Sequence, residues 1–190
     1  MAEQSQARED GKSGAVKRSK RARIISACLT VVAEYGVAAT THRKIAAEAG
    51  VPLGLTTYYF AQLHDVLYEA FSQFAQDSSD AFAESLRVCK TPDAAISVIV
   101  TFILAGQEEG NKASVITHEL YTLASREERF RNITQQWMCG NRTALRRFFD
   151  ADTVRMLDPL IEGLIIHGLL SVNDPDPDLV ERAVRRIVGR

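Results

Sequence analysis

Hydrophobic residues recur at helical spacing along most of this 190-residue chain. The first stripe begins at Ile24 and continues through Cys28 and Val32, and Gly36 follows where a helix could be capped. No stretch alternates apolar and polar residues with a period of two for long enough to compete as a strand, and no internal repeat or sustained heptad occurs. The pattern predicts an all-α fold of about nine helices.

Residues 40–60 contain two short helical runs separated by a tight turn. The hydroxyl of Thr40 or Thr41 can cap the first run, and Gly50 suits the left-handed conformation that ends a helix. Pro52 suits the first turn of the following helix, where an N–H group is not needed. Two helices joined by such a turn predict a helix-turn-helix.

The rest of the chain predicts longer helices separated by turn residues. The apolar pattern restarts near Leu63 or His64, and later breaks fall at glycine, serine, asparagine, aspartate and proline. The expected later helices are Ala94 to about Glu109, Lys112 to Ala124, Glu127 to Phe149, Val154 to Leu170 and Pro177 to Val188.

Positive charge is concentrated at one end of the chain. Residues Lys12–His64 carry eight basic and two acidic side chains, a net of +6, whereas residues 65–190 carry 14 and 19, a net of -5. This asymmetry suggests that the first part meets a polyanion. Residues 1–20 have little to bury and predict a disordered basic arm, which is typical both of nucleic-acid binding and of a plain solvated tail.

The second short helix carries side chains that suit the major groove of DNA. Short hydroxyl side chains can read base edges, while basic and phenolic groups can hold phosphates. A Tyr-Tyr-Phe cluster is also typical of a core, and glycine-turn hairpins occur in proteins that do not bind DNA. The candidates are Thr56 and Thr57 for bases, Tyr58 and Tyr59 for phosphate or sugar, and Arg43 and Lys44 for phosphate or guanine.

Residues Arg21 to Leu67 resemble the DNA-binding domain of the tetracycline-repressor family of transcriptional regulators. The matching residues are Ile24, Ala27, Glu34, Tyr35, Gly36, Val37, Thr41, Arg43, Ile45, Ala46, Ala49, Gly50, Val51, Gly54, Tyr59, Phe60 and Leu67.

The resemblance implies an all-helical dimer with three N-terminal DNA-binding helices and a larger C-terminal domain for ligand binding and dimerisation. The expected divisions are an arm at 1–20, a DNA-binding domain at 21–66 and a ligand and dimer domain at 67–190. One departure is Leu63, which stands where the family often has a phosphate-binding lysine. By position, the implied DNA-contacting residues are Thr41, Arg43, Thr57, Tyr58 and Tyr59, with Leu53 and Leu55 on the exposed surface of the recognition helix.

Polar and aromatic residues lie among apolar ones on the predicted C-terminal helices, as in a small-molecule pocket, although single residues of these types are also typical of a core. The helix Val154 to Leu170 is apolar around more than one face, which favours pairing with a second copy of the chain. The alternative is that these residues pack on the ligand domain of the same chain. The ligand candidates are Phe102, Gln107, His118, Tyr121, Trp137, Asn141 and His167. The dimer candidates are Leu157, Leu160, Ile161, Leu164, Gly168, Val184 and Ile187.

Catalytic and metal chemistry find little support in the sequence. The three cysteines are far apart, which fits neither a disulfide framework nor a zinc site. His118-Glu119 lacks the second histidine of a zinc-protease motif, because Thr122 stands there. We therefore expect no cofactor and no catalytic site.

The sequence predicts a ligand-responsive DNA-binding regulator that lies in the cytoplasm and has no membrane segment. It is expected to be a repressor that binds a pseudo-palindromic operator as a homodimer and is released by a small-molecule effector. Two alternatives stay open: a helical interaction module with this fold but no DNA role, and a small helical enzyme.

Overall fold

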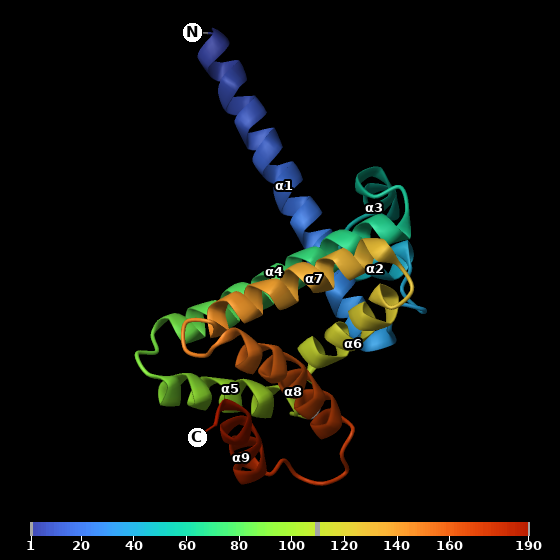
Figure 1. The fold of residues 1–190 in the computed structure, drawn as a ribbon. Helices are drawn as coiled ribbons and strands as arrows, with labels where there is room; N and C mark the ends of the chain where they lie inside the picture. Colours follow the sequence, from blue (N-terminus) through green and yellow to red (C-terminus); the bar gives the residue numbers. More distant parts are fainter. Residues whose placement is uncertain (1, 109–110, 190) are drawn as a thin grey trace. The chain divides into compact units, whose positions relative to one another are not determined.

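The computed structural model describes residues 2–108 and 111–189, with side chains described from residue 19 onward. These residues form nine helices and no strand, which confirms the all-α prediction (Figure 1). The chain divides into two compact units, Met1–Phe71 and Ser72–Arg190. The helices are α1 Ala2–Tyr35, α2 His42–Glu48, α3 Leu53–Tyr59, α4 Leu63–Arg87, α5 Pro92–Gly106, α6 Lys112–Ala124, α7 Glu128–Leu145, α8 Ala151–Leu169 and α9 Pro177–Val188.

Helix α1 includes the segment that the sequence analysis expects to be a disordered arm. It begins at Ala2, so residues 2–20 are helical in the structure. Alanine, glutamate, glutamine, lysine and arginine, which are frequent in this segment, all have high intrinsic helix propensity. The side chains of residues 2–18 and the whole of residue 1 lie outside the described part of the chain.

The ends of the short helices follow from capping residues. Gly36 (φ 72°) ends α1 and Gly50 (φ 60°) ends α2, both in the left-handed region. Thr41 caps α2, because its hydroxyl oxygen accepts a hydrogen bond from the backbone N–H of Lys44 at 3.2 Å. Pro52 is the N-cap residue of α3 and so lies one position before the first turn in which the sequence analysis places it.

The helices of the first unit enclose a small apolar core. The stripe on α1 packs on α2, and α2 packs on α3. Small side chains at Ala46 and Ala49 are buried where these helices meet, which allows the backbones to approach. The core residues are Ile24, Ala27, Cys28, Val31, Val32, Ile45, Ala46, Ala49, Phe60, Val66, Leu67, Ala70 and Phe71.

In the second unit, α5 packs against both α8 and α9, and α6 packs against α7. The apolar side chains of α5 are buried at Ile96, Ile99 and Ile103, and burial of such side chains is the main favourable term in folding. Helix α8 continues through Pro159, which is exposed, so the backbone carbonyl that the proline leaves unpaired can be hydrated.

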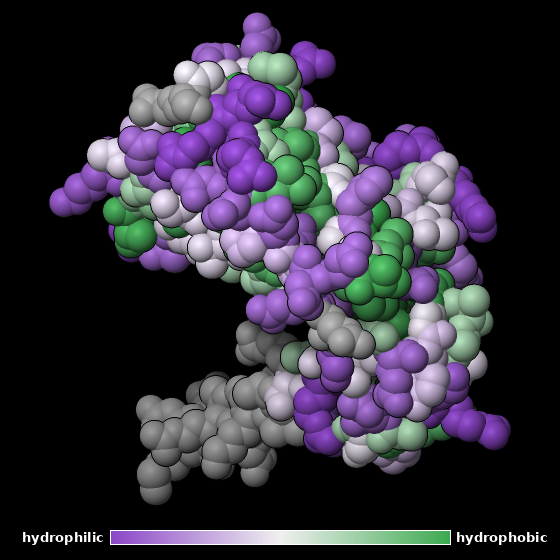
Figure 2. Space-filling view, turned by 90° about the horizontal axis from the view of Figure 1, so that it is seen from below, coloured by the Kyte–Doolittle hydropathy of each residue, from purple (hydrophilic) through white to green (hydrophobic). Residues whose placement is uncertain are grey.

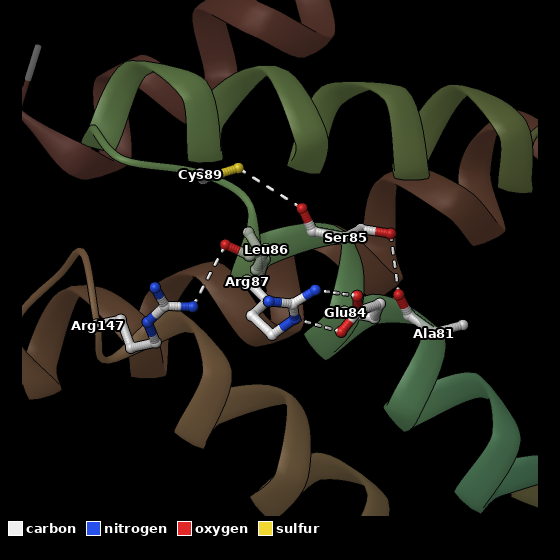
Figure 3. A network of polar contacts seen from close by, with 7 residues as sticks. All are labelled: Ala81, Glu84, Ser85, Leu86, Arg87, Cys89 and Arg147. Carbon is white, nitrogen blue, oxygen red and sulfur yellow. Dashed lines mark hydrogen bonds and ion pairs between the residues drawn. The ribbon is translucent and has the colours of Figure 1, made fainter.

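The C-terminal ends of α4 and α7 are joined by polar contacts (Figure 3). Nη1 of Arg147 donates to the backbone carbonyl oxygen of Leu86 at 3.4 Å. Arg87 forms a two-pronged ion pair with Glu84, at 2.6 and 2.7 Å. The Arg147 bond satisfies a carbonyl group at the end of α4, and the guanidinium groups of Arg87 and Arg147 lie at the negative end of the α4 dipole.

Three later helices differ in their bounds from the sequence expectation. Helix α8 begins at Ala151 instead of Val154, because the carboxylate of Asp150 caps it, and it ends at Leu169 instead of Leu170. Helix α7 ends at Leu145 instead of Phe149, and its chain continues as a turn. Helix α5 begins at Pro92, because the hydroxyl of Thr91 caps it, and it ends at Gly106. The bounds of α6 and α9 match the expected helices.

Candidate functional site

Helix α3 presents an exposed face built from residues of the predicted recognition helix. Tyr58 is 71% exposed and Leu53 is 44% exposed, and Thr57 is also exposed. The rings of Tyr58 and Tyr59 meet edge to face at 5.3 Å between centroids, and Tyr59 is only partly buried. Leu55 is partly buried as well.

The predicted base contact at Thr56 is wrong. Thr56 is fully buried, and its hydroxyl donates to the backbone carbonyl oxygen of Leu53 at 2.7 Å. Because α3 advances by about 100° per residue, neighbouring Thr57 lies on the exposed side while Thr56 faces the core. The hydroxyl of Thr57 donates to the carbonyl oxygen of Gly54 at 3.2 Å, and its oxygen still has lone pairs that can accept a hydrogen bond from a base edge.

The N-terminal end of α2 offers one exposed guanidinium and one ammonium that is already engaged. Arg43 is exposed, next to the exposed cap residue Thr41. Lys44 folds back, because its Nζ donates to the carbonyl oxygen of Ala39 at 2.9 Å and lies 4.0 Å from the ring centroid of Tyr35. Of the two basic candidates, Arg43 is therefore better placed for phosphate.

Part of the basic run before α2 has a structural role that sequence reasoning missed. Arg21 pairs with Glu69 and lies over the ring of Phe60. Arg23 donates to the carbonyl oxygen of Ala49 at 2.5 Å, at the C-terminal end of α2, where a cation is favoured. Lys20 is exposed.

The second unit contains a cavity of about 290 Å³, open on one side, between α4, α5, α6, α7 and α8. Its volume is at the lower end of the range for small-molecule sites. Aromatic rings form much of the wall, in two pairs: Phe82 with Phe102 at 4.9 Å and Phe74 with Trp137 at 5.6 Å between ring centroids. Such a wall suits a compact ligand with apolar or flat surfaces.

A carboxyl group stands in this aromatic wall. Glu162 of α8 lines the cavity and accepts a hydrogen bond from the hydroxyl of Tyr121. Burial raises the pKa of Glu162, the Tyr121 hydroxyl opposes this shift, and the negative charge of Asp158 adds to it. Burial lowers the pKa of His118, which lines the same cavity, so this imidazole favours its neutral form.

Only some of the predicted ligand residues lie at the cavity. Phe102, His118 and Trp137 line the cavity, and Tyr121 touches it indirectly through Glu162. The other three lie outside the wall of this cavity, so the structure does not bring them together with the first four. Gln107 donates to the backbone carbonyl of Leu164 at 2.9 Å and lines a different pocket, Asn141 is outside the cavity wall, and His167 is exposed.

Sequence reasoning missed several cavity residues. Phe74, Phe82 and Glu162 were not singled out, because aromatic residues on an amphipathic helix are usually core. Glu162 carried a usable signal, since it is an acidic residue inside the apolar run from Leu160 to Ile165. Burial of a carboxyl group is unfavourable, so an acidic residue in such a run indicates a position where the carboxyl group has a specific role.

A wider groove of about 990 Å³ runs between α4 and α7. At its floor the helices approach closely, since a Cβ on Gly140 would lie 2.4 Å from Oγ of Ser79. Its wall includes small residues together with the charged side chains of Glu84, Arg87 and Arg147. We favour the smaller cavity as the ligand site, because it is lined by aromatic rings with few orienting polar groups.

Three of the predicted dimer residues belong to the core of the subunit. Leu157, Ile161 and Val184 are buried against the apolar side chains of α5, so they are not free to contact a second chain. Gly168 lies against the side chain of Gln107, where a Cβ would come within 2.2 Å. The assignments of Leu157, Ile161 and Val184 are therefore corrected. Gly168, Leu160, Leu164 and Ile187 are only partly buried, and their place in a dimer interface stays a prediction.

Other apolar residues of α8 and α9 are more exposed. Met156 is 48% and Leu179 is 52% exposed. Met156, Leu160 and Gly163 recur at helical spacing, which places them on one face of α8. Figure 2 shows hydrophobic patches within a largely hydrophilic surface in the view from below Figure 1.

Within the part of the chain that the structure describes, no group of three or more histidine, cysteine or acidic side chains is arranged to hold a metal ion. None of the described helices is both long enough and apolar enough to cross a membrane.

Comparisons with known proteins point to one family. Residues 90–190 match the family model described as the tetracyclin repressor-like C-terminal domain. The chain is 26% identical over 169 residues to the HTH-type transcriptional regulator BetI 1 of Chromohalobacter salexigens, covering 84% of this chain and 83% of that protein.

Solved structures agree in fold over nearly the whole chain. SCO7518 from Streptomyces coelicolor A3(2), described as a transcriptional regulator, is 38% identical with a TM-score of 0.82, covering 90% of this chain and 99% of that one. The multidrug binding protein EbrR complexed with ethidium is 29% identical with a TM-score of 0.75, covering 89% and 98%. Other crystal structures of EbrR hold proflavin and malachite green.

Proposed function

Because the chain belongs to the tetracycline-repressor family of transcriptional regulators, we propose that it is a repressor that binds a pseudo-palindromic operator as a homodimer and is released by a small molecule. The family membership makes it a ligand-responsive DNA-binding regulator and not an enzyme. The operator, the dimer and the effector are the proposed parts.

The observation that carries the DNA-binding proposal is the exposed face of α3 in a helix-turn-helix. Thr57 and Tyr58 are exposed there, and Arg43 is exposed on α2. A second helix that presents such side chains can lie in the major groove, with Thr57 at base edges and the other two at phosphates. Leu53, Leu55 and Tyr59 complete this surface, with Thr41 at the cap of α2.

The effector is proposed to bind in the aromatic cavity of the second unit. EbrR, whose structures hold ethidium, proflavin and malachite green, supports a site for organic molecules in a related chain. Helix α4 supplies Phe74 and Phe82 to the cavity wall and begins at Leu63, within the first unit. A ligand that prefers one position of α4 would therefore shift the spacing of the two DNA-binding domains in a dimer.

The dimer is proposed to form through α8 and α9. The outward face of α8 carries Met156 and Leu160, and α9 adds Leu179 and Ile187. Pairing these helices with their two-fold mates gives a four-helix bundle, and the two recognition helices would then read two half-sites one or more helical turns apart. The protein is proposed to act in the cytoplasm.

The test is selection of bound duplexes from a random DNA library, followed by titration of the selected duplex against salt. We expect an inverted repeat whose affinity falls steeply with salt and falls further in Arg43→Ala. A folded protein that enriches no duplex at low salt would instead favour a helical interaction module with no DNA role. Leu63, in place of a lysine, is the feature that keeps this second function in view.

A further inference from the structure

We propose that the aromatic cavity selects a compact organic cation, with the carboxylate of Glu162 as its counter-charge and the faces of the surrounding rings as its walls. This inference rests on the proposed function, in which the same cavity is the effector site. It adds the charge and size of the ligand, which the family membership leaves open.

Glu162 lacks a cationic partner among the described residues. On the same helix, Asp158 has a counter-charge, since Nε of Arg142 lies 3.5 Å from its carboxylate. Among the described residues, no ion pair joins Glu162 to a basic side chain; its partner is the neutral hydroxyl of Tyr121. Once Asp158 and Arg142 are paired, the cavity wall keeps one unmatched acidic group.

The other polar groups that face the cavity supply no positive charge to balance Glu162. His118 on α6 is the basic side chain in the wall, and its lowered pKa means that it supplies no positive charge at neutral pH. The remaining polar groups are uncharged: Ser78 and Ser85 on α4, Asn111 at the cap of α6, and Ser114 and Thr117 on α6. An anionic ligand would therefore meet the Glu162 carboxylate without a compensating cation.

The aromatic wall of the cavity also favours a cation. Phe74, Phe82, Phe102 and Trp137 surround the same space, and an organic cation is attracted to the faces of such rings. A cation between a carboxylate and aromatic faces is attracted by the negative charge and by the rings. Both attractions are strongest where water is excluded. The volume of about 290 Å³ limits the ligand to a compact molecule.

The experiment compares two probes of equal shape. Benzyltrimethylammonium carries a fixed positive charge, and neopentylbenzene has the same arrangement of heavy atoms with carbon in place of nitrogen. Binding of each to the full chain is measured by calorimetry or by displacement of a fluorescent ligand. We expect the cation to bind at least about tenfold more tightly than the neutral compound, a difference of about 1.4 kcal/mol.

The matched variant is Glu162→Gln, which keeps the side-chain shape and an oxygen acceptor for the Tyr121 hydroxyl. It should lose most of the affinity for benzyltrimethylammonium and keep or improve its affinity for neopentylbenzene. Circular dichroism and thermal unfolding check that the variant is folded. Asp158→Asn is the control, because it removes a carboxylate that lies outside the cavity wall and should change the preference far less.

Equal or tighter binding of neopentylbenzene by the unchanged protein would overturn the proposal, as would unchanged cation affinity in Glu162→Gln. Failure of both probes to bind at millimolar concentration would overturn it too. Operator binding is measured on the same samples without any probe. Loss of the cation preference with operator binding intact would leave the regulator proposal standing, whereas absent operator binding would count against that proposal alone.

Discussion

Neighbouring threonines on α3 show how strongly one position along a helix changes the role of a residue. Thr56 and Thr57 have the same side chain, yet the first is buried and the second exposed. Composition and motif spacing cannot distinguish them, because which threonine is buried depends on which side of α3 packs against α2. The pair therefore offers a matched test of the DNA-binding surface.

We expect Thr57→Val to weaken operator binding by about 1 kcal/mol, since it removes an exposed hydroxyl while keeping the side-chain shape. Thr56→Val should leave operator affinity unchanged and lower the free energy of unfolding by about 1 kcal/mol, since it removes the buried bond to the carbonyl of Leu53. Electrophoretic mobility shift and chemical unfolding measure the two effects. Equal operator affinity for Thr57→Val and the unchanged protein would remove Thr57 from the interface.

The pH dependence of stability should report the buried carboxyl group of Glu162. Its pKa is raised in the folded protein, so unfolding releases a proton and the folded state loses relative stability as pH rises from the ordinary glutamate pKa to the raised one. Glu162→Gln should therefore unfold at a higher temperature than the unchanged protein at neutral pH. The difference should vanish below the ordinary glutamate pKa, and a difference that is constant with pH would contradict this assignment.

At the scale of elements, glycines with different backbone conformations make contrasting predictions. Gly50 ends α2 with φ 60°, and a Cβ there would also lie 3.2 Å from the guanidinium of Arg23. Gly54 lies inside α3, and a Cβ there meets nothing within 4 Å.

Gly50→Ala should lower the free energy of unfolding by about 1 to 2 kcal/mol, because a side chain disfavours the left-handed region. Gly54→Ala should raise it by about 0.5 to 1 kcal/mol, because alanine is the better helix former. Denaturant titration of both variants gives the two values. A destabilising Gly54→Ala would mean that α3 is held in a conformation that alanine does not favour.

Helix bounds were the most predictable part of the structure, because they depend on local chemistry. Thr41, Gly36 and Gly50 cap or end helices as expected, and α6 and α9 have the predicted bounds. Burial was less predictable. Leu157 and Val184 are core rather than interface, since a broad apolar face does not tell which part of it covers α5. The cavity was found only in part, because its wall comes from five helices.

At the scale of the whole molecule, association should depend on apolar residues that one subunit leaves exposed. Met156 is the clearest of these on α8, whereas Leu164 is partly buried against the core and its substitution would also disturb the fold.

We expect Met156→Glu to shift the dimer toward monomers in sedimentation velocity and to weaken operator binding in parallel, since two half-sites then require two separate encounters. Arg155→Glu is the control on the adjacent position, because it introduces the same residue on a different side of α8. Dimers of unchanged stability in Met156→Glu would exclude this face of α8 from the interface.

The carboxyl group of Glu162 also links the regulator to the acidity of its surroundings. At a pH near its raised pKa, the empty cavity holds a fraction of a proton, and a ligand that stabilises the carboxylate must expel that fraction into solution. The heat of binding would then vary with the ionisation enthalpy of the buffer. The regulator would then respond when an organic cation replaces the proton on Glu162. The effector concentration needed for this response would rise as the pH of the cell falls.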